Sequence, residues 1–337
     1  MWLVNKAFRA GARPLSRRLA ALLLAGAVVS VSIPPVEAQE RYPSRPIKIL
    51  LPYTPGGGHD TTARLIAQEV SQRTGATLVI ENRPGANGNI GTEAAAKAPP
   101  DGYTLVYNGP SVTTNQWIYP RLGFDPVKDL VPVLLTAKLP LVLVTNPSVP
   151  ATTLAEFIAY AKANPGKLTY ASSGIGGSPH LANLLFQRAV GIQALHVPYR
   201  GGAPALNDLL GGSVQFYMDG ANAALPFIKA GQLRALAVTS STRLKDLPDV
   251  PTIAEVVPNF EVVSWQGLMA PAGTPQPTID WIGNEFRRAI GEPELRSKML
   301  VQELVPVGST QDEYRAFLER ETALWQKVIT EANIKID

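Results

Sequence analysis

The chain has 337 residues, a formal net charge of +4 and no cysteine, which excludes disulfide bonds and a lipid anchor on cysteine. Its first 38 residues hold five basic residues and one acidic residue, so they carry that net charge, and the remainder is neutral. The calculated pI of about 9.2 therefore gives no support to nucleic-acid binding. The neutral remainder is long enough to bury the cores of two domains.

Residues 1–38 have the pattern of a secretory signal peptide. A basic segment precedes an apolar run, residues 19–31, that is too short to cross a bilayer comfortably. Small residues then suit cleavage after Ala38. We expect export to the periplasm by the Sec route or, because Arg17 and Arg18 are adjacent, by the twin-arginine route.

Strands alternate with helices from residue 41 to about residue 140. The first helix is the clearest, because Ala63, Ile66 and Val70 are spaced to share one buried face. Alternation of this kind predicts a mainly parallel sheet with helices on its faces. The expected elements are strands at 47–51, 78–81 and 103–108, a helix after Asp60 and a short helix at 91–98.

A second set of strand–helix units follows an apolar, β-rich stretch at 139–145. Residues 240–258 are polar and contain proline, so we expect a surface connection with at most a short helix. Residues 262–270 predict a strand that returns to the first set, and Thr310 with Glu313 forms a capping box before the last helix. The remaining expected elements are helices at 153–163, 279–290 and 294–302, helices after Ser178, Gly202 and Gly220, and strands at 168–171, 194–197, 214–218 and 233–239.

A glycine-rich turn joins the first strand to the first helix. Gly56, Gly57 and Gly58 stand before Asp60, which we expect to cap the helix with its carboxylate. Without Cβ atoms the turn lets a small ligand approach the main chain, and the helix start behind it favours an anion. The alternative is a tight turn that binds nothing.

The same pattern recurs in the second half of the chain. Residues 172–178 form a glycine turn with Ser178 expected at the N-cap and Pro179 at the first helical position. Arg200 adds a cation to a third turn, although a solvated surface charge is an equal alternative. Hydrogen bonds to an ionised group contribute about 1.5–3 kcal/mol each, so a few donors suffice for the ~8 kcal/mol of micromolar binding. Repeated turns therefore favour an anion-binding cleft.

Catalysis has little support. His59 and His180 are candidate general bases, but no nucleophile elbow, cysteine, nucleotide-binding fingerprint or metal-ligand spacing accompanies them. Two alternatives to a transport receptor stay open: a secreted hydrolase or isomerase acting on a small organic acid, and a ligand-sensing domain that signals to a membrane sensor. Tyr53 and Tyr199 stand near turns and can wall an apolar ligand body or simply pack, and Asp219 can cap a helix.

Ordered motifs span almost all of the chain after the leader. They lie at residues 42–47, 52–64, 81–86, 100–105, 172–181, 197–202 and 208–212, and include Tyr-Pro-Ser-Arg-Pro-Ile, Pro-Asp-Gly-Tyr-Thr-Leu and Val-Pro-Tyr-Arg-Gly-Gly. With these motifs the chain resembles the tripartite tricarboxylate transporter (TTT) substrate-binding proteins, the Bug receptors.

The resemblance implies an α/β fold of the type 2 periplasmic binding protein class. Two lobes with mainly parallel sheets would be joined by two crossing strands, near 139–145 and 261–268. Lobe 1 would comprise 39–140 plus 265–337, and lobe 2 would comprise 141–264. The ligand would lie between the lobes, which close over it.

The resemblance also implies a function. The protein would be a monomer that captures a small organic carboxylate, aromatic in some members, and delivers it to TTT membrane permease subunits. It would need no cofactor or metal, would not bind nucleic acid and would not be an enzyme. The glycine turns would hold the carboxylate, partly through main-chain N–H groups and water. The residues expected to bind the ligand are Tyr53, Thr54, Gly57, Gly58, His59, Asp60, Ser172, Ser173, Gly174, Gly176, Gly177, Ser178, His180, Tyr199, Arg200 and Asp219.

Overall fold

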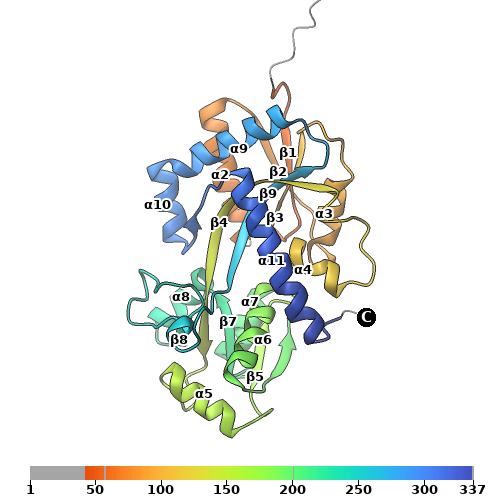
Figure 1. Cartoon of the computed structure of the whole chain (residues 1–337). Coiled ribbons are helices and arrows are strands. Elements are labelled where there is room, and N and C mark those ends of the chain that lie inside the picture. The colour runs from red at the N-terminus through yellow and green to blue at the C-terminus, as the bar shows by residue number, and fades with distance from the viewer. Residues whose placement is uncertain (1–41, 57, 200, 336–337) are drawn as a thin grey trace, which may run out of the picture. The chain divides into compact units, whose positions relative to one another are not determined.

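A ten-stranded mixed sheet runs through the part of the chain that this computed structural model describes, residues 42–56, 58–199 and 201–335 (Figure 1). The expected signal peptide, Gly57 and Arg200 lie outside the described residues. In order across the sheet, the strands are β2 (Leu78–Asn82), β1 (Ile47–Leu51), β3 (Thr104–Asn108), β9 (Val263–Pro271), β4 (Leu130–Thr145), β7 (Phe216–Gly220), β5 (Thr169–Ser172) and β6 (Leu195–Pro198). β8 (Arg234–Val238) and β10 (Val305–Pro306) also pair with β4.

The first lobe is built on β1, β2 and β3, which pair in parallel. Ile47 and Ile49 of β1 pack in one core with Ile66 and Val70, as the helical spacing predicts. This lobe contains α2 (Gly58–Thr74), α3 (Asn89–Ala96), α4 (Ser111–Ile118), α9 (Gln276–Gly291), α10 (Pro293–Val301) and the 3-10 turn η1 (Ala86–Gly88).

The second lobe is built on β5, which pairs in parallel with β6 and β7. Phe157, Tyr170, Phe186 and Phe216 are among the buried residues of its core. Its helices are α5 (Leu154–Ala163), α6 (Ser178–Val190), α7 (Gly202–Leu210) and α8 (Ala221–Lys229). The stretch 240–258 holds only the 3-10 turn η2 (Ile253–Glu255), which confirms the expected surface connection.

The strands β4 and β9 pass between the two lobes (Figure 1). They are antiparallel to each other from Leu130 opposite Pro271 to Pro140 opposite Val263. Beyond Pro140, β4 continues into the second lobe and pairs antiparallel with β7 and β8. Parallel pairing therefore holds among the outer strands of each lobe, whereas the crossing strands make the whole sheet mixed.

Besides the short η1 and β10, α4 and the first half of β4 were not expected from the sequence. The β-branched residues Val112, Thr113 and Thr114 weaken the helical signal of α4, but all three are buried. Pro132 argues against a central strand. The register of β4 against β9 shifts between Pro132 and Leu134, and this irregularity lets the proline sit inside the strand.

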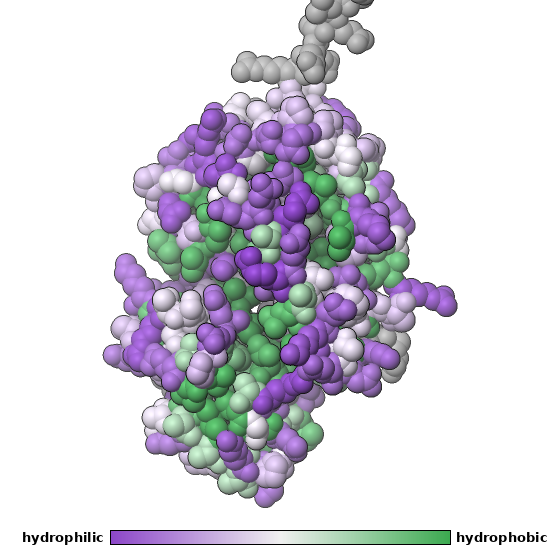
Figure 2. All heavy atoms as spheres, viewed as in Figure 1, coloured by the Kyte–Doolittle hydropathy of each residue, from purple (hydrophilic) through white to green (hydrophobic). Residues whose placement is uncertain are grey.

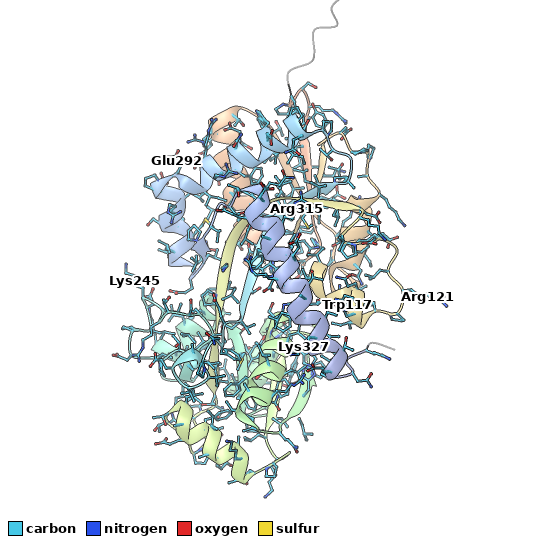
Figure 3. All side chains as sticks on the ribbon, viewed as in Figure 1. Trp117, Arg121, Lys245, Glu292, Arg315 and Lys327 are labelled. Atoms are coloured by element: carbon cyan, nitrogen blue, oxygen red, sulfur yellow. The ribbon has the colours of Figure 1, made fainter. Side chains whose placement is uncertain are left out.

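The last helix, α11 (Gln311–Glu331), connects the cores of both lobes (Figure 1). Its capping box is confirmed: Glu313 N–H donates to Thr310 Oγ1 (3.2 Å), and Thr310 N–H donates to Glu313 Oε2 (2.8 Å). Tyr314 packs in a core of the first lobe, whereas Trp325 belongs to the cluster that contains the second-lobe core. Trp117 of α4 lies next to α11 and packs on the same cluster (Figure 3).

The face drawn in Figure 2 is mostly hydrophilic over the first lobe and shows more apolar side chains over the second. Among the described residues, none of the helices combines the length and apolar character needed to span a membrane.

Candidate functional site

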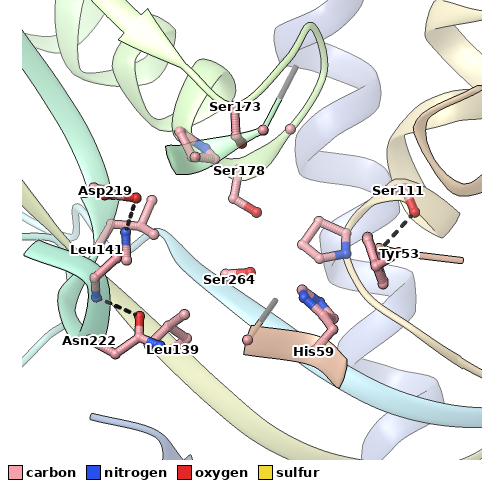
Figure 4. A pocket seen from close by; sticks show the side chains of 18 of the residues that line it. Tyr53, His59, Ser111, Leu139, Leu141, Ser173, Ser178, Asp219, Asn222 and Ser264 are labelled. Carbon is pink, nitrogen blue, oxygen red and sulfur yellow. Dashed lines mark hydrogen bonds between the residues drawn. The ribbon is translucent and has the colours of Figure 1, made fainter. Parts of the chain in front are cut away.

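A cavity of about 370 Å³ lies between the two lobes, with walls from both (Figure 4). The first lobe contributes the turn after β1 and the segment between β3 and α4. The second lobe contributes the loop that follows β5, the end of β7 with the first turn of α8, and the start of α7. Leu139 and Leu141 of β4 and Ser264 of β9 also line the cavity, so the crossing strands form part of the wall.

Five helices begin at this cavity. The lining includes the first residue of α2, α4, α6 and α7, and Gly220, which directly precedes α8. In α/β units a helix begins shortly after the carboxyl end of each strand, so the helix starts of each lobe gather at the carboxyl ends of its parallel strands. The first N–H groups of a helix have no partner within it and form the positive end of its dipole. The cavity therefore suits a negatively charged group.

Eight of the fourteen expected ligand-binding residues that the structure describes line the cavity. None of the described lining residues is lysine or arginine, so these residues offer an anion helix starts and neutral donors. The expected residues that line the cavity are Tyr53, Thr54, Gly58, His59, Ser173, Gly177, Ser178 and Asp219. Those that lie elsewhere in the described structure are Asp60, Ser172, Gly174, Gly176, His180 and Tyr199.

Asp60 is not the N-cap of α2, because the helix already begins at Gly58 and Asp60 lies in its first turn. Its buried carboxylate accepts hydrogen bonds from Gly56 N–H (3.0 Å), Arg64 Nε (3.0 Å) and Asn82 Nδ2 (2.9 Å). Burial opposes ionisation, but these donors outweigh it and lower the pKa of Asp60 to about 2. Asp60 therefore fixes the turn from behind rather than facing the cavity.

His180 and His196 support the second glycine turn in a similar way. The two rings stack with centroids 4.0 Å apart, and Gly176 N–H donates to His180 Nδ1 (3.1 Å). His196 Nε2 lies 2.6 Å from Ser172 Oγ. Burial, with a smaller effect of His196, lowers the pKa of His180 to about 3, and burial lowers that of His196 to about 4. Both imidazoles are therefore neutral near pH 7, as an accepting Nδ1 requires.

Ser178 is not an N-cap either. It is the first residue of α6, the cap position belongs to Gly177, and no side chain caps the helix. Pro179 therefore occupies the second helical position, one residue later than expected. Asp219 does not cap α8 either. The N-cap residue of α8 is Gly220, and no side chain makes a capping hydrogen bond there.

The amides of the glycine turns are largely used within their own loops. Gly56 N–H donates to Asp60, Gly174 N–H to Ser172 Oγ (3.2 Å) and Gly177 N–H to the carbonyl of Gly174 (3.4 Å). The groups that face the cavity are instead hydroxyls and the first turns of the helices. Tyr199 points its hydroxyl to Asp208 (2.6 Å), away from the lining.

Tyr53 and His59 form the first-lobe end of the cavity (Figure 4). Their rings stack 4.0 Å apart, and the Tyr53 hydroxyl donates to Asn108 Oδ1 (3.1 Å). His59 Nε2 is buried and has no hydrogen-bond partner among the described residues. Burial lowers the pKa of His59 to about 4, partly opposed by the nearby carbonyl of Trp265, so the ring carries no charge at neutral pH.

Asp219 and Tyr217 form the second-lobe end. Asp219 Oδ1 accepts from Gly220 N–H (2.8 Å), whereas Asp219 Oδ2 and the Tyr217 hydroxyl are buried without partners among the described residues. Burial raises the pKa of Asp219 to about 7, against the effects of the Gly220 amide and of the nearby Tyr217 hydroxyl. This end therefore holds a carboxyl group that is close to its titration point at neutral pH.

Several lining residues were missed from the sequence. Ser111 and Asn222 follow strand ends, and the rule that ligands bind at the carboxyl ends of strands could have found them. Leu139 and Ser264 carry no local signal, because only the crossing of β4 and β9 brings them to the cavity. The other missed lining residues include Asn87, Pro110, Pro179, Tyr217 and Ala223.

The described residues contain no group of three or more histidine, cysteine, aspartate or glutamate side chains placed to hold a metal ion. His59 lines the cavity, but His180, the other candidate base, does not.

The family described as the tripartite tricarboxylate transporter family receptor, TctC, matches residues 62–334 of the chain. The chain belongs to this family. Its relatives include the protein BugT of Bordetella pertussis, 38% identical over 305 residues that cover 90% of this chain and 93% of BugT.

Solved structures agree with this assignment. The R. palustris protein Rpa4515, solved with adipate, is 36% identical with a TM-score of 0.81 over 88% of this chain and 100% of that one. MatC from Rhodopseudomonas palustris, solved with bound malate, is 30% identical with a TM-score of 0.76 over 86% of this chain and 100% of MatC. The resemblance to the Bug receptors and the two-lobed α/β fold that it implied are therefore confirmed.

Proposed function

We propose that this TctC-family receptor captures a small organic carboxylate between its lobes in the periplasm and delivers it to a separate TTT membrane permease. The observation that carries the proposal is the meeting of helix starts from both lobes at one cavity. The cavity's volume of about 370 Å³ falls within the range of small-molecule sites. Two relatives solved with carboxylates, adipate and malate, support the same class of ligand.

The described lining can stabilise an anionic ligand with neutral hydrogen-bond donors, without a salt bridge. The described lining offers hydroxyls from Thr54, Ser173, Ser178 and Ser264, whereas the Ser111 hydroxyl donates to Asn108 Oδ1 (2.9 Å). Hydrogen bonds from neutral donors to a carboxylate contribute about 1.5–3 kcal/mol each. Three or four of them, with the helix starts, reach micromolar affinity after the cost of association is subtracted.

Capture requires the lobes to move about the two crossing strands. We propose lobe 1 as 39–140 plus 265–337 and lobe 2 as 141–264, with the hinge where β4 and β9 leave the first lobe. Closure removes water from the cavity and strengthens each contact with the ligand's charge. The end of α11, which packs with the second-lobe core, lies across this boundary.

A panel of mono- and dicarboxylates of three to eight carbons tests the proposal on protein expressed without residues 1–38. We expect at least one acid to raise the melting temperature and to bind by calorimetry. Recovery of the ligand unchanged, by NMR, distinguishes a receptor from the hydrolase or isomerase alternative, which would use His59. A panel in which no acid binds would contradict the proposal.

A charge placed at the helix starts gives the sharpest variant. Ser178→Asp puts a carboxylate at the first turn of α6, where it stabilises the helix but repels a bound anion. Like charges about 4 Å apart in a medium of dielectric constant about 20 cost about 4 kcal/mol, so affinity should fall at least about a hundredfold. Ser178→Asn is the matched control of nearly the same size, and equal losses in both variants would point to crowding instead.

A further inference from the structure

We propose that Asp219 makes this receptor prefer carboxylates whose far end carries a hydrogen-bond donor, a hydroxyl or an ammonium group, over dicarboxylates of the same length. The proposal rests on the proposed function and specifies its ligand. Asp219 and Ser111 lie on opposite sides of the cavity, so one ligand carboxylate can sit at the starts of α4 and α6 while its other end faces Asp219 (Figure 4).

Asp219 has one carboxylate oxygen that forms no hydrogen bond among the described residues. The residue is only 6% exposed and lines the cavity at the end of β7. Its Oδ1 accepts from Gly220 N–H, but Oδ2 has no partner among the described residues. A buried carboxylate oxygen without a donor is costly, and a ligand that brings a donor removes that cost.

The neighbouring Tyr217 extends this recognition. Tyr217 is buried and lines the cavity, and its hydroxyl makes no hydrogen bond of normal geometry among the described residues, although Asp219 and Ser173 lie near enough to affect its pKa. A Cβ atom built at Gly202 would lie 3.7 Å from this hydroxyl and 3.8 Å from Asp219 Oδ1, so the glycine leaves room for a ligand beside both. A ligand hydroxyl can donate to Asp219 and accept from Tyr217 at the same time.

A second ligand carboxylate fits this end poorly. The titratable groups of the described lining are Tyr53, His59, Tyr217 and Asp219, and neither His59 nor the tyrosines supply a positive charge at neutral pH. Two carboxylates without a cation between them share a site only when one of them takes a proton. Among the described lining residues, the positive ends at the starts of α7 and α8 are shared with Asp219 itself. Against this lining a second ligand carboxylate is accommodated best when Asp219 is protonated, whereas a hydroxyl or ammonium group suits the ionised form.

Sets of acids matched in chain length test the preference at pH 7.5 by calorimetry. Each set, from four to eight carbons, contains the dicarboxylate, the ω-hydroxy acid, the ω-amino acid and the unsubstituted acid, for example adipate, 6-hydroxyhexanoate, 6-aminohexanoate and hexanoate. For the lengths that bind, we expect the better of the hydroxy and amino acids to bind at least about tenfold more tightly than the dicarboxylate.

Asp219→Asn keeps the size of the side chain and removes its charge. We expect this variant to lose affinity for the amino acid and to gain affinity for the dicarboxylate, so that the ratio between them falls about tenfold or reverses. Asp312→Asn on the exposed surface of α11 removes the same charge elsewhere and should leave the ratio unchanged.

The outcomes separate this inference from the proposed function. If the wild-type receptor binds dicarboxylates more tightly at every length, or if Asp219→Asn leaves the ratio unchanged, the inference is wrong while the receptor function stands. If no acid of any set binds, both are contradicted.

Discussion

Single side chains behind the cavity hold its loops in place. Asp60 accepts a hydrogen bond from Gly56 in the first glycine turn, and the stacked His180 and His196 bond to Gly176 and Ser172 in the second. None of these three side chains lines the cavity. Burial lowers the pKa of His180 to about 3 and that of His196 to about 4, so both imidazoles stay neutral and support the second glycine turn until the pH falls to about 4.

His180 should make the fold sensitive to acid. Its folded pKa of about 3 lies below the usual 6.5, so the unfolded chain binds a proton that the folded chain does not. The resulting stability is present above about pH 6.5 and is lost as pH falls toward 3, at about 1.4 kcal/mol per pH unit for one proton. Urea unfolding at pH 7.5, 6.5, 5.5 and 4.5 measures this slope.

His180→Phe provides the comparison, because it keeps a stacking ring and cannot titrate. Its slope with pH should be smaller by about one proton, even though loss of the acceptor for Gly176 N–H lowers its stability at every pH. The pKa of Asp219 is raised rather than lowered, but this holds in both proteins, so the contribution of Asp219 to the pH slope cancels in the comparison. Equal slopes would show that His180 is not the group that titrates.

Gly109 should tolerate no side chain. A Cβ atom there would lie 2.6 Å from His59 Nε2 and 2.8 Å from the carbonyl oxygen of Trp265, and the second contact is with backbone. Gly109→Ala should lower the free energy of unfolding by about 1–3 kcal/mol and weaken ligand binding, because His59 must move into the cavity. Gly291→Ala, where a Cβ meets nothing within 4 Å, is the control and should change stability by less than about 1 kcal/mol. Comparable losses in the two variants, measured by urea unfolding and calorimetry, would contradict this.

At the scale of elements, α11 packs with the cores of both lobes. Glu321 near its middle accepts from Trp265 Nε1 (3.1 Å) on β9 and from Trp325 Nε1 (2.9 Å) on its own helix. Burial raises the pKa of this carboxyl, and the two indole donors oppose that effect. The helix is thereby attached to a crossing strand as well as to both cores.

The capping box should contribute measurably to this helix. Thr310→Ala removes the acceptor for Glu313 N–H and should lower the free energy of unfolding by about 1 kcal/mol. Thr310→Ser keeps the acceptor and should cost less than half as much. In the Thr310→Ala background, Glu313→Ala should cost less than it does in the wild type, because the two caps are reciprocal. Additive losses in urea unfolding would show that the box does not act as a unit.

At the scale of the whole described molecule, the crossing strands place helix starts from two lobes around one space. The lobes also touch beside the cavity, where Thr114 Oγ1 of α4 lies 3.5 Å from the carbonyl oxygen of Gly176. The side chain of Ile118 leaves no room for a Cβ at Gly176, whose ideal position is 2.3 Å from Ile118 Cδ1. A ligand that contacts both lobes therefore adds to these contacts, which already hold the lobes close together.

Ligand binding should make the receptor more compact. In small-angle X-ray scattering of protein lacking residues 1–38, a saturating acid found in the panel should reduce the radius of gyration, since the closed form is the one in which both walls contact the ligand. The Ser178→Asp variant with the same acid should keep the ligand-free value. An unchanged radius at full occupancy would rule out closure about β4 and β9 as the capture step.

Most elements could be predicted from the sequence because their signals are local. Apolar spacing in residues 63–70, the glycine turns and the Thr310–Glu313 box depend on neighbours within one or two helical turns. Pro132 in β4 and the β-branched start of α4 misled the same reasoning, because burial outweighed local propensity there. The helix starts inferred from Asp60 and Ser178 were too late by three residues and by one residue, because α2 begins at Gly58 and α6 at Ser178.

The sequence by itself determined the family, the succession of strands and helices, and the turns from which the cavity is built. Only the tertiary structure decided which turn residues face the cavity, because Asp60 and His180 use the amides of their own loops and leave the helix starts to face a ligand. It also placed Leu139, Ser264 and the unpaired oxygen of Asp219 in the wall. Such positions depend on contacts between residues far apart in the chain, which no local pattern encodes.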